Sequence, residues 1–368
     1  MEIQKIEIFK SKIKLKEAFI ISLEKLEYAE NVIVKITTNE GLVGFGECSP
    51  FKTINGESIE TCYEIGQYLA KVLLGKNPID IELCINLMDK VIYGNASIKS
   101  AFDMALYDIA SQYAKLPLYL FLNGSKNKTL ITDYTISIGD PQKMASDAIE
   151  IKEQEYKIIK VKLGENKKND IERIQFIRQA VGMEIPIRID ANQGWNTTET
   201  IETLSELEKY NIQHCEEPIP RWSFMDLPYI SLNSNIPIMA DESCCNHHDA
   251  DRLIKINACK LFNVKLGKSG GIYDALKIIK LAEQALIKIQ IGGFLESRLG
   301  FTASAHLALS SDCITFFDFD TPLMFVEDNI IGGISYSKGG EVNIPDSIGL
   351  GAQPDETYLN KLPKIIIS

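Results

Sequence analysis

Short apolar runs alternate with longer amphipathic stretches over the last two thirds of the chain. Eight of these runs are predicted to be β-strands, at residues 130–137, 158–163, 187–190, 212–216, 237–241, 261–265, 288–293 and 314–319. The intervals between them are long enough for a helix and two loops. Strands that alternate with helices in this way favour a parallel sheet, and eight units predict a barrel of the (β/α)8 type.

The first part of the chain has a different pattern. Residues 32–38 and 42–47 read as two strands joined by Asn39-Glu40-Gly41, which predicts an antiparallel hairpin. Residues 98–114 carry apolar side chains at helical spacing. Pro117 and the pair Asn123-Gly124 then interrupt the pattern. An α+β unit is therefore expected to end in this region.

These patterns divide the chain into three parts. We expect an α+β capping domain at residues 1–125 and a barrel at residues 126–322. Residues 323–368 are rich in glycine and turns, and we expect them to return to the first domain.

Three carboxylates close successive predicted strands: Asp190, Glu216 and Asp241. Because successive βα units bring strand ends to the same edge of a parallel sheet, we expect these side chains to lie together. A single acid at a strand end is usually a solvated loop residue, but three in register are not explained in that way. Like charges in one cleft repel unless a cation holds them, and Mg²⁺ prefers oxygen ligands. The sequence predicts one Mg²⁺ site per subunit.

Lysines occur on the predicted strands that flank these acids. Lys160 and Lys162 are two residues apart in one strand and therefore share a face, and Lys265 closes a later strand. Two ammonium groups on one face are unfavourable unless anions lie opposite them. We therefore expect the lysines to face the carboxylates.

Composition and charge exclude several classes of function. The chain has 368 residues, of which 45% are hydrophobic and 24% charged, and its formal net charge is -11. This charge argues against nucleic-acid and membrane partners. The eight cysteines form no CxxC pair and read as free thiols of a reducing compartment. With no signal-like or spanning segment in the sequence, we expect a cytoplasmic protein.

Taken together, the motifs resemble the muconate lactonizing enzyme subgroup of the enolase superfamily. The resemblance runs essentially from end to end and rests on Lys160-Val-Lys162, Asp190-Ala-Asn192-Gln-Gly-Trp195, Glu216-Glu-Pro218, Asp241-Glu-Ser243 and Val264-Lys265-Leu266 followed by Gly270-Gly271. It implies a modified (β/α)7β barrel with an N-terminal α+β capping domain. It also implies that Asp190, Glu216 and Asp241 bind Mg²⁺. Lys162 and Lys265 would then transfer protons on opposite faces of the substrate.

Within the subgroup, the chain resembles the dipeptide epimerases. Asp318 and Asp320 look like the pair by which these enzymes hold the α-ammonium group of a dipeptide. Lys160 is expected to bind the substrate carboxylate. Further substrate contacts are inferred for Thr135, Asn192, Glu296 and Ser297. The implied reaction removes the α-proton of the C-terminal residue from one side and returns it from the other, which inverts that carbon.

Substrate preference is expected to depend on capping loops near residues 16–30 and 48–56. Phe19, Phe51 and Ile54 are expected to line the side-chain pocket, although core packing explains them equally well. Some epimerases that act on Ala-Glu carry an arginine where this chain has Glu24 and Lys25. Glu24 would repel a glutamate side chain, whereas Lys25 could pair with it. L-Ala-L-Glu, converted to L-Ala-D-Glu, is the favoured substrate, with tolerance of other L-Ala-L-Xaa dipeptides.

Other functions remain open at the level of sequence. One is a different reaction of the same subgroup: cycloisomerisation, o-succinylbenzoate synthesis or N-acylamino acid racemisation. A second is a barrel glycosidase that uses two carboxylates and needs no metal. A third is a metal-stabilised barrel without catalytic activity. Relatives often assemble as symmetric homo-oligomers, so we expect the same here.

Overall fold

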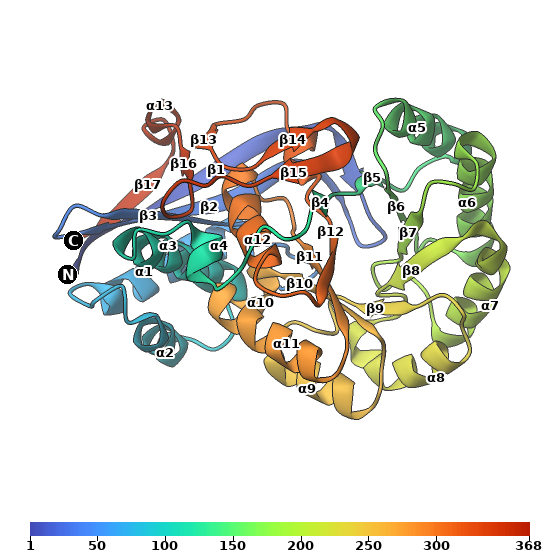
Figure 1. Ribbon diagram of the computed structural model, residues 1–368, viewed down its shortest axis with the longest axis horizontal. Helices are drawn as coiled ribbons and strands as arrows, with labels where there is room; N and C mark the ends of the chain where they lie inside the picture. The colour runs from blue at the N-terminus through green and yellow to red at the C-terminus, as the bar shows by residue number, and fades with distance from the viewer.

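The largest element of the computed structural model, which describes residues 1–368, is an eight-stranded parallel sheet curled into a barrel (Figure 1). Its strands follow one another in chain order and are β5 (Tyr134–Ile136), β6 (Ile159–Lys162), β7 (Ile187–Asp190), β8 (Ile212–Glu216), β9 (Ile238–Ala240), β10 (Leu261–Lys265), β11 (Lys288–Gly292) and β12 (Ile314–Phe317). The first and last strands, β5 and β12, meet at the seam of the barrel. There the Asp133 amide donates to the Phe317 carbonyl at 3.4 Å. All eight predicted barrel strands are present, although only the second half of the first one (130–137) belongs to the barrel, as β5.

Seven crossover helices connect the eight strands. They are α5 (Pro141–Glu153), α6 (Lys167–Val181), α7 (Thr197–Leu207), α8 (Leu227–Leu232), α9 (His247–Lys255), α11 (Ile272–Gln284) and α12 (Arg298–Ala308). Shorter helical turns lie at α10 (Leu266–Ser269), η1 (Glu208–Tyr210), η2 (Arg221–Asp226) and η3 (Thr321–Met324). The last strand, β12, is followed by the short turn η3 instead of an eighth crossover helix, so the expected (β/α)7β architecture is confirmed. No helix of the chain is both long and apolar enough to span a membrane.

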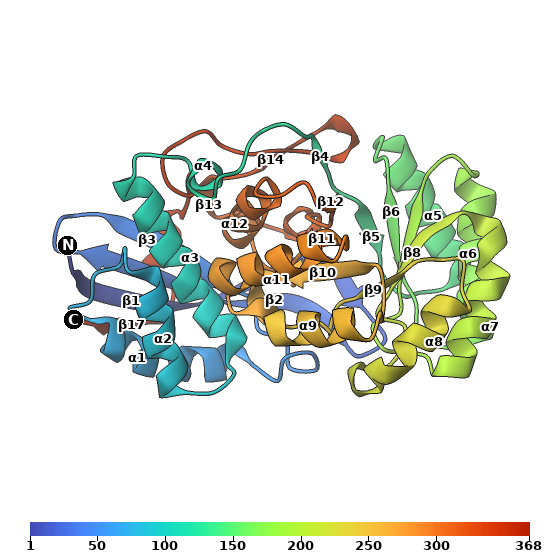
Figure 2. The same ribbon diagram turned by 60° about the horizontal axis from the view of Figure 1, so that its bottom comes forward.

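The capping domain is an antiparallel sheet covered by helices. The sheet has the order β17 (Lys364–Ile367), β1 (Ile3–Ile20), β2 (Lys25–Thr38) and β3 (Val43–Cys48). The helices are α1 (Ile59–Leu73), α2 (Ile81–Val91), α3 (Ala96–Tyr113) and α4 (Leu118–Phe121). Figure 2 shows α1, α2 and α3 beside this sheet and the two chain termini next to each other. The predicted hairpin is present as β2 and β3.

Glycines in β3 allow the sheet to lie directly against α3. A Cβ atom on Gly44 would lie 2.2 Å from the Ala105 carbonyl oxygen, and one on Gly46 would lie 1.9 Å from that of Ala101. Neither space can hold a side chain, so these glycines set the distance between sheet and helix.

The remaining C-terminal chain forms small elements over the barrel and cap. They are β13 (Ile330–Gly332), β14 (Ser335–Ser337), η4 (Lys338–Gly340), β15 (Glu341–Asn343), β16 (Ala352–Pro354) and α13 (Glu356–Leu359). β15 pairs with β4 (Leu130–Ile131), so the predicted strand 130–137 is divided into two strands of different sheets. The break occurs where the Thr132 amide donates to the Gly340 carbonyl and Asp133 becomes fully buried.

A buried histidine makes the stability of the fold depend on pH. The Tyr119 amide donates to His306 Nδ1 at 3.1 Å, and His306 Nε2 lies 3.0 Å from the Leu350 carbonyl oxygen. The neutral ring thus joins α4, α12 and the C-terminal segment. Burial lowers the pKa of His306 from 6.5 to about 4. The unfolded chain therefore takes up a proton first as the pH falls.

Between pH 7 and pH 5, protonation of His306 in the unfolded chain is expected to lower the free energy of unfolding by about 2 kcal/mol. The stabilisation that the neutral ring provides is complete above pH 6.5 and is lost as the pH falls towards 4. Urea unfolding at the two pH values measures this difference. In His306→Gln the pH dependence should shrink by that amount. An equal dependence in both proteins would contradict the assignment.

Candidate active site and metal centre

Three buried carboxylates meet at the C-terminal edge of the barrel. Asp190 ends β7, Glu216 ends β8, and Asp241 directly follows β9. Each offers an oxygen within 4.8 Å of the others, and all three side chains are fully buried. The strands are neighbours in the sheet, which explains why residues far apart in sequence come together. The structure thus brings together the trio that the spacing predicted.

Lysines from the flanking strands contact this trio. Lys160 Nζ lies 2.8 Å from Glu216 and 3.4 Å from Asp190. Lys162 Nζ lies 2.6 Å from Asp190, and Lys265 Nζ lies 2.7 Å from Asp241. Lys162 belongs to β6 and Lys265 to β10, whereas the carboxylates belong to the intervening strands β7 to β9. The two lysines therefore approach the trio from opposite sides.

Charge pairing keeps these groups ionised despite their burial. Burial alone would raise the pKa of Asp190, but Lys162 and Lys160 outweigh it and lower that pKa. Burial would lower the pKa of Lys265, but the carboxylates of Asp241 and Glu216 raise it instead. As the structure stands, the lysines are the counter-ions of the carboxylates.

Neighbouring polar groups orient the trio. The Asn263 side chain donates to Glu216 Oε1 at 2.7 Å, and the Asn192 amide donates to Asp190 Oδ1 at 2.9 Å. By contrast, the two buried carboxylate oxygens of Asp241 have only ammonium groups as partners: Lys265 at 2.7 Å from Oδ2 and Lys268 at 3.0 Å from Oδ1. An all-oxygen set of three carboxylates suits a hard divalent cation such as Mg²⁺. The residues present therefore fit this metal.

Lys268 belongs to the same cluster, although sequence reasoning did not select it. Its ammonium group lies 3.0 Å from Asp241 Oδ1 and donates to the carbonyls of Cys244 and Asn263, each at 2.7 Å. The only sequence signal was its position one helical turn after Lys265. A lysine so fully engaged with backbone carbonyls holds the Asp241 loop in place.

A small cavity lies over the trio, between the barrel and the cap. Its lining is Phe19, Ile21, Phe51 and Ile54 from the cap, and Thr135, Lys162, Asn192, Lys265, Gly293, Phe294, Leu295, Asp318, Asp320 and Thr321 from the barrel. Its volume of about 30 Å³ is close to that of one water molecule. The capping loops must therefore open before a peptide-sized molecule can enter. Ile21, Phe294, Leu295 and Thr321 were not identified from sequence.

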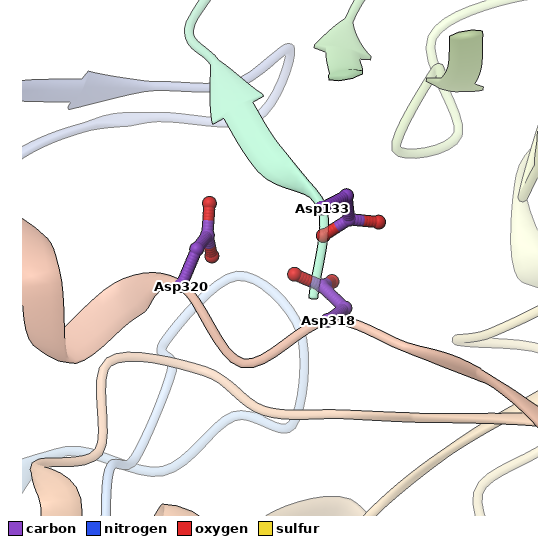
Figure 3. Close-up of side chains that lie close together, drawn as sticks. All are labelled: Asp133, Asp318 and Asp320. Atoms are coloured by element: carbon purple, nitrogen blue, oxygen red, sulfur yellow. The ribbon is translucent and has the colours of Figure 1, made fainter. Parts of the chain in front are cut away.

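A second acidic cluster lies at one end of this cavity, and two of its three members, Asp318 and Asp320, line it. Figure 3 shows Asp133 before the first barrel strand, facing Asp318 and Asp320 in the chain that follows the last one. Lys160 Nζ lies 2.8 Å from Asp318, and Arg188 lies 2.7 Å from Asp133. The Thr135 amide donates to Asp320 at 2.6 Å. Three carboxylates at the barrel seam thus share two cationic partners.

The two aspartates of the motif differ in protonation. Burial would raise the pKa of Asp318, but Lys160 outweighs it and lowers that pKa. Burial and the charge of Asp318 raise the pKa of Asp320 to about 7. The last barrel strand is shorter than the predicted range 314–319, because β12 ends at Phe317 and Asp320 has helical backbone angles. A turn, rather than strand alternation, brings the two carboxylates together.

Five other residues that were predicted to contact or select the substrate do not line the cavity: Lys160, whose ammonium group contacts Glu216, Asp318 and Asp190, and Glu24, Lys25, Glu296 and Ser297. Glu24 accepts a hydrogen bond from Thr53 at 3.0 Å, and Lys25 is exposed and lies 3.6 Å from Glu27. Glu296 accepts from the Phe294 amide at 2.6 Å, and Ser297 donates to Glu47 at 2.7 Å. Glu296 and Ser297 therefore hold the loop that carries Phe294 rather than facing the cavity themselves.

Arg221 is another residue that sequence reasoning missed. It lies in η2. Its guanidinium group donates to the carbonyls of Ile54 and Thr53 and to the side-chain oxygen of Gln193. It thus ties the barrel to the capping loop that carries Phe51 and Ile54.

Comparisons with known proteins agree with this architecture. Residues 3–122 match the family model described as the mandelate racemase / muconate lactonizing enzyme N-terminal domain, and residues 143–358 match the enolase C-terminal domain-like model. The D-Ala-D/L-Ala epimerase of Cytophaga hutchinsonii is 57% identical over 368 residues, which is 100% of both chains.

Solved structures give the same result. The crystal structure of a dipeptide epimerase from Cytophaga hutchinsonii, complexed with Mg and the dipeptide D-Ala-L-Val, has a TM-score of 0.99, 57% identity and 100% coverage of both chains. The substrate-liganded L-Ala-D/L-Glu epimerase of Bacillus subtilis has a TM-score of 0.93 and 38% identity, over 96% of this chain and 99% of that one. The chain therefore belongs to the mandelate racemase / muconate lactonizing enzyme family of the enolase superfamily, in its dipeptide epimerase group.

Proposed function

We propose that this protein is a Mg²⁺-dependent epimerase that inverts the α-carbon of the C-terminal residue of a dipeptide. The observation that carries the proposal is the placement of Lys162 and Lys265, which line one cavity and flank the carboxylate trio from opposite sides. Inversion needs one group to remove the α-proton and another, on the other face, to return one. Two opposed lysines supply both.

The trio Asp190, Glu216 and Asp241 would hold the metal. When bound, Mg²⁺ supplies positive charge for the negative charge that develops on the substrate carboxylate as its α-proton leaves. Lys160, fully buried beside Glu216, would position the same carboxylate. Lys162 and Lys265 would alternate as base and acid, depending on which epimer enters. The rings of Phe19 and Phe294 lie over the ammonium groups of Lys162 and Lys265, at 5.7 and 5.0 Å.

Asp318 and Asp320 would bind the α-ammonium group of the dipeptide. Both line the cavity, and Asp318 is held in its charged form. Thr135 and Asn192, which also line the cavity, would contact the peptide between the ammonium and carboxylate ends. This arrangement favours a dipeptide over N-acylated amino acids and over the substrates of cycloisomerases and o-succinylbenzoate synthases, because those carry no ammonium group.

The C-terminal side chain is proposed to be small and apolar rather than glutamate. The cavity walls from the cap are Phe19, Ile21, Phe51 and Ile54, with no basic residue among them. Lys25, which was expected to pair with glutamate, lies outside the cavity beside Glu27. The name of the 57% identical relative, a D-Ala-D/L-Ala epimerase, supports the same preference. Ala-Ala and Ala-Val therefore replace L-Ala-L-Glu as the favoured substrates.

Incubation of dipeptides in D₂O with Mg²⁺ tests the proposal. Ala-Ala, Ala-Val and Ala-Glu, with the first residue in either configuration, would be followed by mass spectrometry and chiral chromatography. We expect deuterium at the C-terminal α-carbon together with inversion, and faster turnover of Ala-Ala than of Ala-Glu. N-acetyl-Ala-Ala should react much more slowly. A preference for the acetylated compound would instead favour an N-acylamino acid racemase, and no exchange at all would favour a non-catalytic barrel.

Removal of the metal should abolish activity. Dialysis against EDTA is expected to lower the epimerisation rate by at least about 10³-fold, since the single charge of Lys160 would then replace a divalent ion beside the developing negative charge. Added Mg²⁺ should restore the rate. It should also raise the unfolding temperature, because a ligand at 100 times its Kd stabilises the fold by about 2.7 kcal/mol.

The variant Glu216→Gln provides the control for metal binding. It keeps the shape of the side chain but removes one charge from the trio, so the stabilisation by Mg²⁺ should be largely lost. Full epimerisation after removal of the metal would overturn the proposal. Independence of metal is what the glycosidase alternative predicts for its own reaction.

A further inference from the structure

A second cavity of about 220 Å³ opens beside the first one. It lies between the end of β1 (residues 16–19), strand β5 with the residue that follows it (134–137), the outer face of α5 (residues 147–154) and Met324 of η3. We refer to it as the α5 groove. Phe19 and Thr135 line both cavities, so the groove adjoins the site above the carboxylate trio at these two side chains.

The groove begins at the end of the site where the substrate amino group is proposed to lie. Thr135, in its wall, donates its amide proton to Asp320 at 2.6 Å. Met324, in another wall, belongs to the turn that starts directly after Asp320. A group that extends from the first α-carbon of a bound dipeptide can therefore enter the groove. A longer peptide cannot use it in this way, because acylation of its amino group removes the charge that Asp318 and Asp320 would bind.

The groove has an apolar floor and an acidic rim. Phe19, Ile136, Ile151 and Met324 supply apolar surface. Asp147, Glu150, Ile151 and Gln154 are spaced along one face of α5, which places both carboxylates over that floor.

The charged groups of the rim have a negative balance. Glu17 adds a third acid to Asp147 and Glu150, whereas Lys16 is the only base in the lining and donates to the Leu323 carbonyl at 2.8 Å. Lys143, outside the groove, pairs with Asp147 and lies 3.7 Å from Glu17. The lining of the groove therefore carries a net charge of about -2. Lys143 neutralises at most one of these negative charges.

We infer that the α5 groove receives the side chain of the substrate's N-terminal residue and favours long basic side chains. The methylene groups of lysine or arginine would cover the apolar floor while the charged end reaches the acidic rim, the arrangement that such side chains adopt at apolar surfaces. This inference rests on the proposed function and specifies its substrate class: dipeptides that begin with Lys or Arg are substrates in addition to those that begin with Ala.

A substrate series separates charge from size. Ala-Ala, Lys-Ala, norleucine-Ala and Glu-Ala would be compared in D₂O with Mg²⁺, each with the first residue in both configurations. Norleucine has the chain of lysine without the ammonium group. For the preferred configuration we expect kcat/KM for Lys-Ala to exceed that for norleucine-Ala by about fivefold, as expected for partly exposed charge pairs. Glu-Ala should be slower than norleucine-Ala.

The double variant Asp147→Asn/Glu150→Gln tests the rim directly. It should reduce kcat/KM for Lys-Ala to the value for norleucine-Ala and leave that for Ala-Ala unchanged. Glu153→Gln is the matched control, because Glu153 is an exposed acid of the same helix that does not line the groove. This control should keep the preference for lysine.

The outcomes distinguish the groove from the activity itself. Epimerisation of Ala-Ala without any preference for Lys-Ala over norleucine-Ala would overturn the groove assignment and leave the proposed function standing. The same holds if the double variant keeps the full preference. Failure of every dipeptide to exchange its α-proton would overturn both.

Discussion

Replacement of either cavity lysine by methionine is expected to abolish epimerisation but to leave exchange of the α-proton of one epimer intact. Lys162→Met and Lys265→Met each remove one of two acid–base groups, so the rate of inversion should fall by at least about 10³-fold. The remaining lysine still faces one side of the substrate. Each variant should therefore exchange the α-proton of one epimer with deuterium without converting it, and the two variants should act on opposite epimers.

Nuclear magnetic resonance of each epimer in D₂O measures this exchange. Methionine has nearly the length of lysine and no charge, so the walls of the cavity are preserved. Asp190 keeps Lys160 at 3.4 Å after loss of Lys162, and Asp241 keeps Lys268 at 3.0 Å after loss of Lys265. A cooperative unfolding transition should confirm that each variant folds. Exchange of the same epimer by both variants would contradict opposed lysines.

The sequence predicted the barrel because its strands are buried on both faces and its helices have one apolar face. Ile159, Val161, Ile187 and Ile189 are fully buried and face the helices, while the side chains between them face the barrel interior. Periodicity detects such elements. It did not detect the division of residues 130–137, since that division depends on pairing between β4 and β15, which lie about 200 residues apart in the chain.

The metal and lysine positions were predictable because strand ends fix them. Asp190, Glu216 and Lys265 each occupy the last position of a strand, and parallel neighbours place such positions side by side. Loop residues have no such constraint. Glu24 and Lys25 follow the cavity-lining Ile21 by only three and four residues, yet their partners are Thr53 and Glu27. Side-chain direction in a capping loop depends on tertiary contacts that sequence spacing does not contain.

Two of the missed residues, Arg221 and Lys268, act through backbone groups. Arg221 binds the carbonyls of a capping loop, and Lys268 binds those of Cys244 and Asn263. Every residue carries a carbonyl group, so such contacts leave no pattern in the side-chain sequence. Chemical motifs reveal groups that face a ligand more readily than groups that hold a loop.

Substitution of Asp318 by asparagine is expected to lower kcat/KM for dipeptides by about 30-fold or more, the loss typical when one partner of a buried charge pair is removed. Asp318 is charged because Lys160 lies 2.8 Å away and lowers its pKa. Asparagine keeps the shape of the side chain but cannot balance the added charge of a substrate ammonium group. Lys160 retains Glu216 at 2.8 Å, so the fold should persist.

Asp133→Asn is the matched control for this variant. Asp133 belongs to the same acidic cluster but contacts Arg188 and does not line the cavity. Its replacement should lower stability and change kcat/KM far less than Asp318→Asn does. The Asp318→Asn variant should also lose the preference for Ala-Ala over N-acetyl-Ala-Ala, because that preference comes from the ammonium group. Unchanged turnover of Ala-Ala in this variant would show that the ammonium group binds elsewhere, and the preference for free dipeptides would then need another origin.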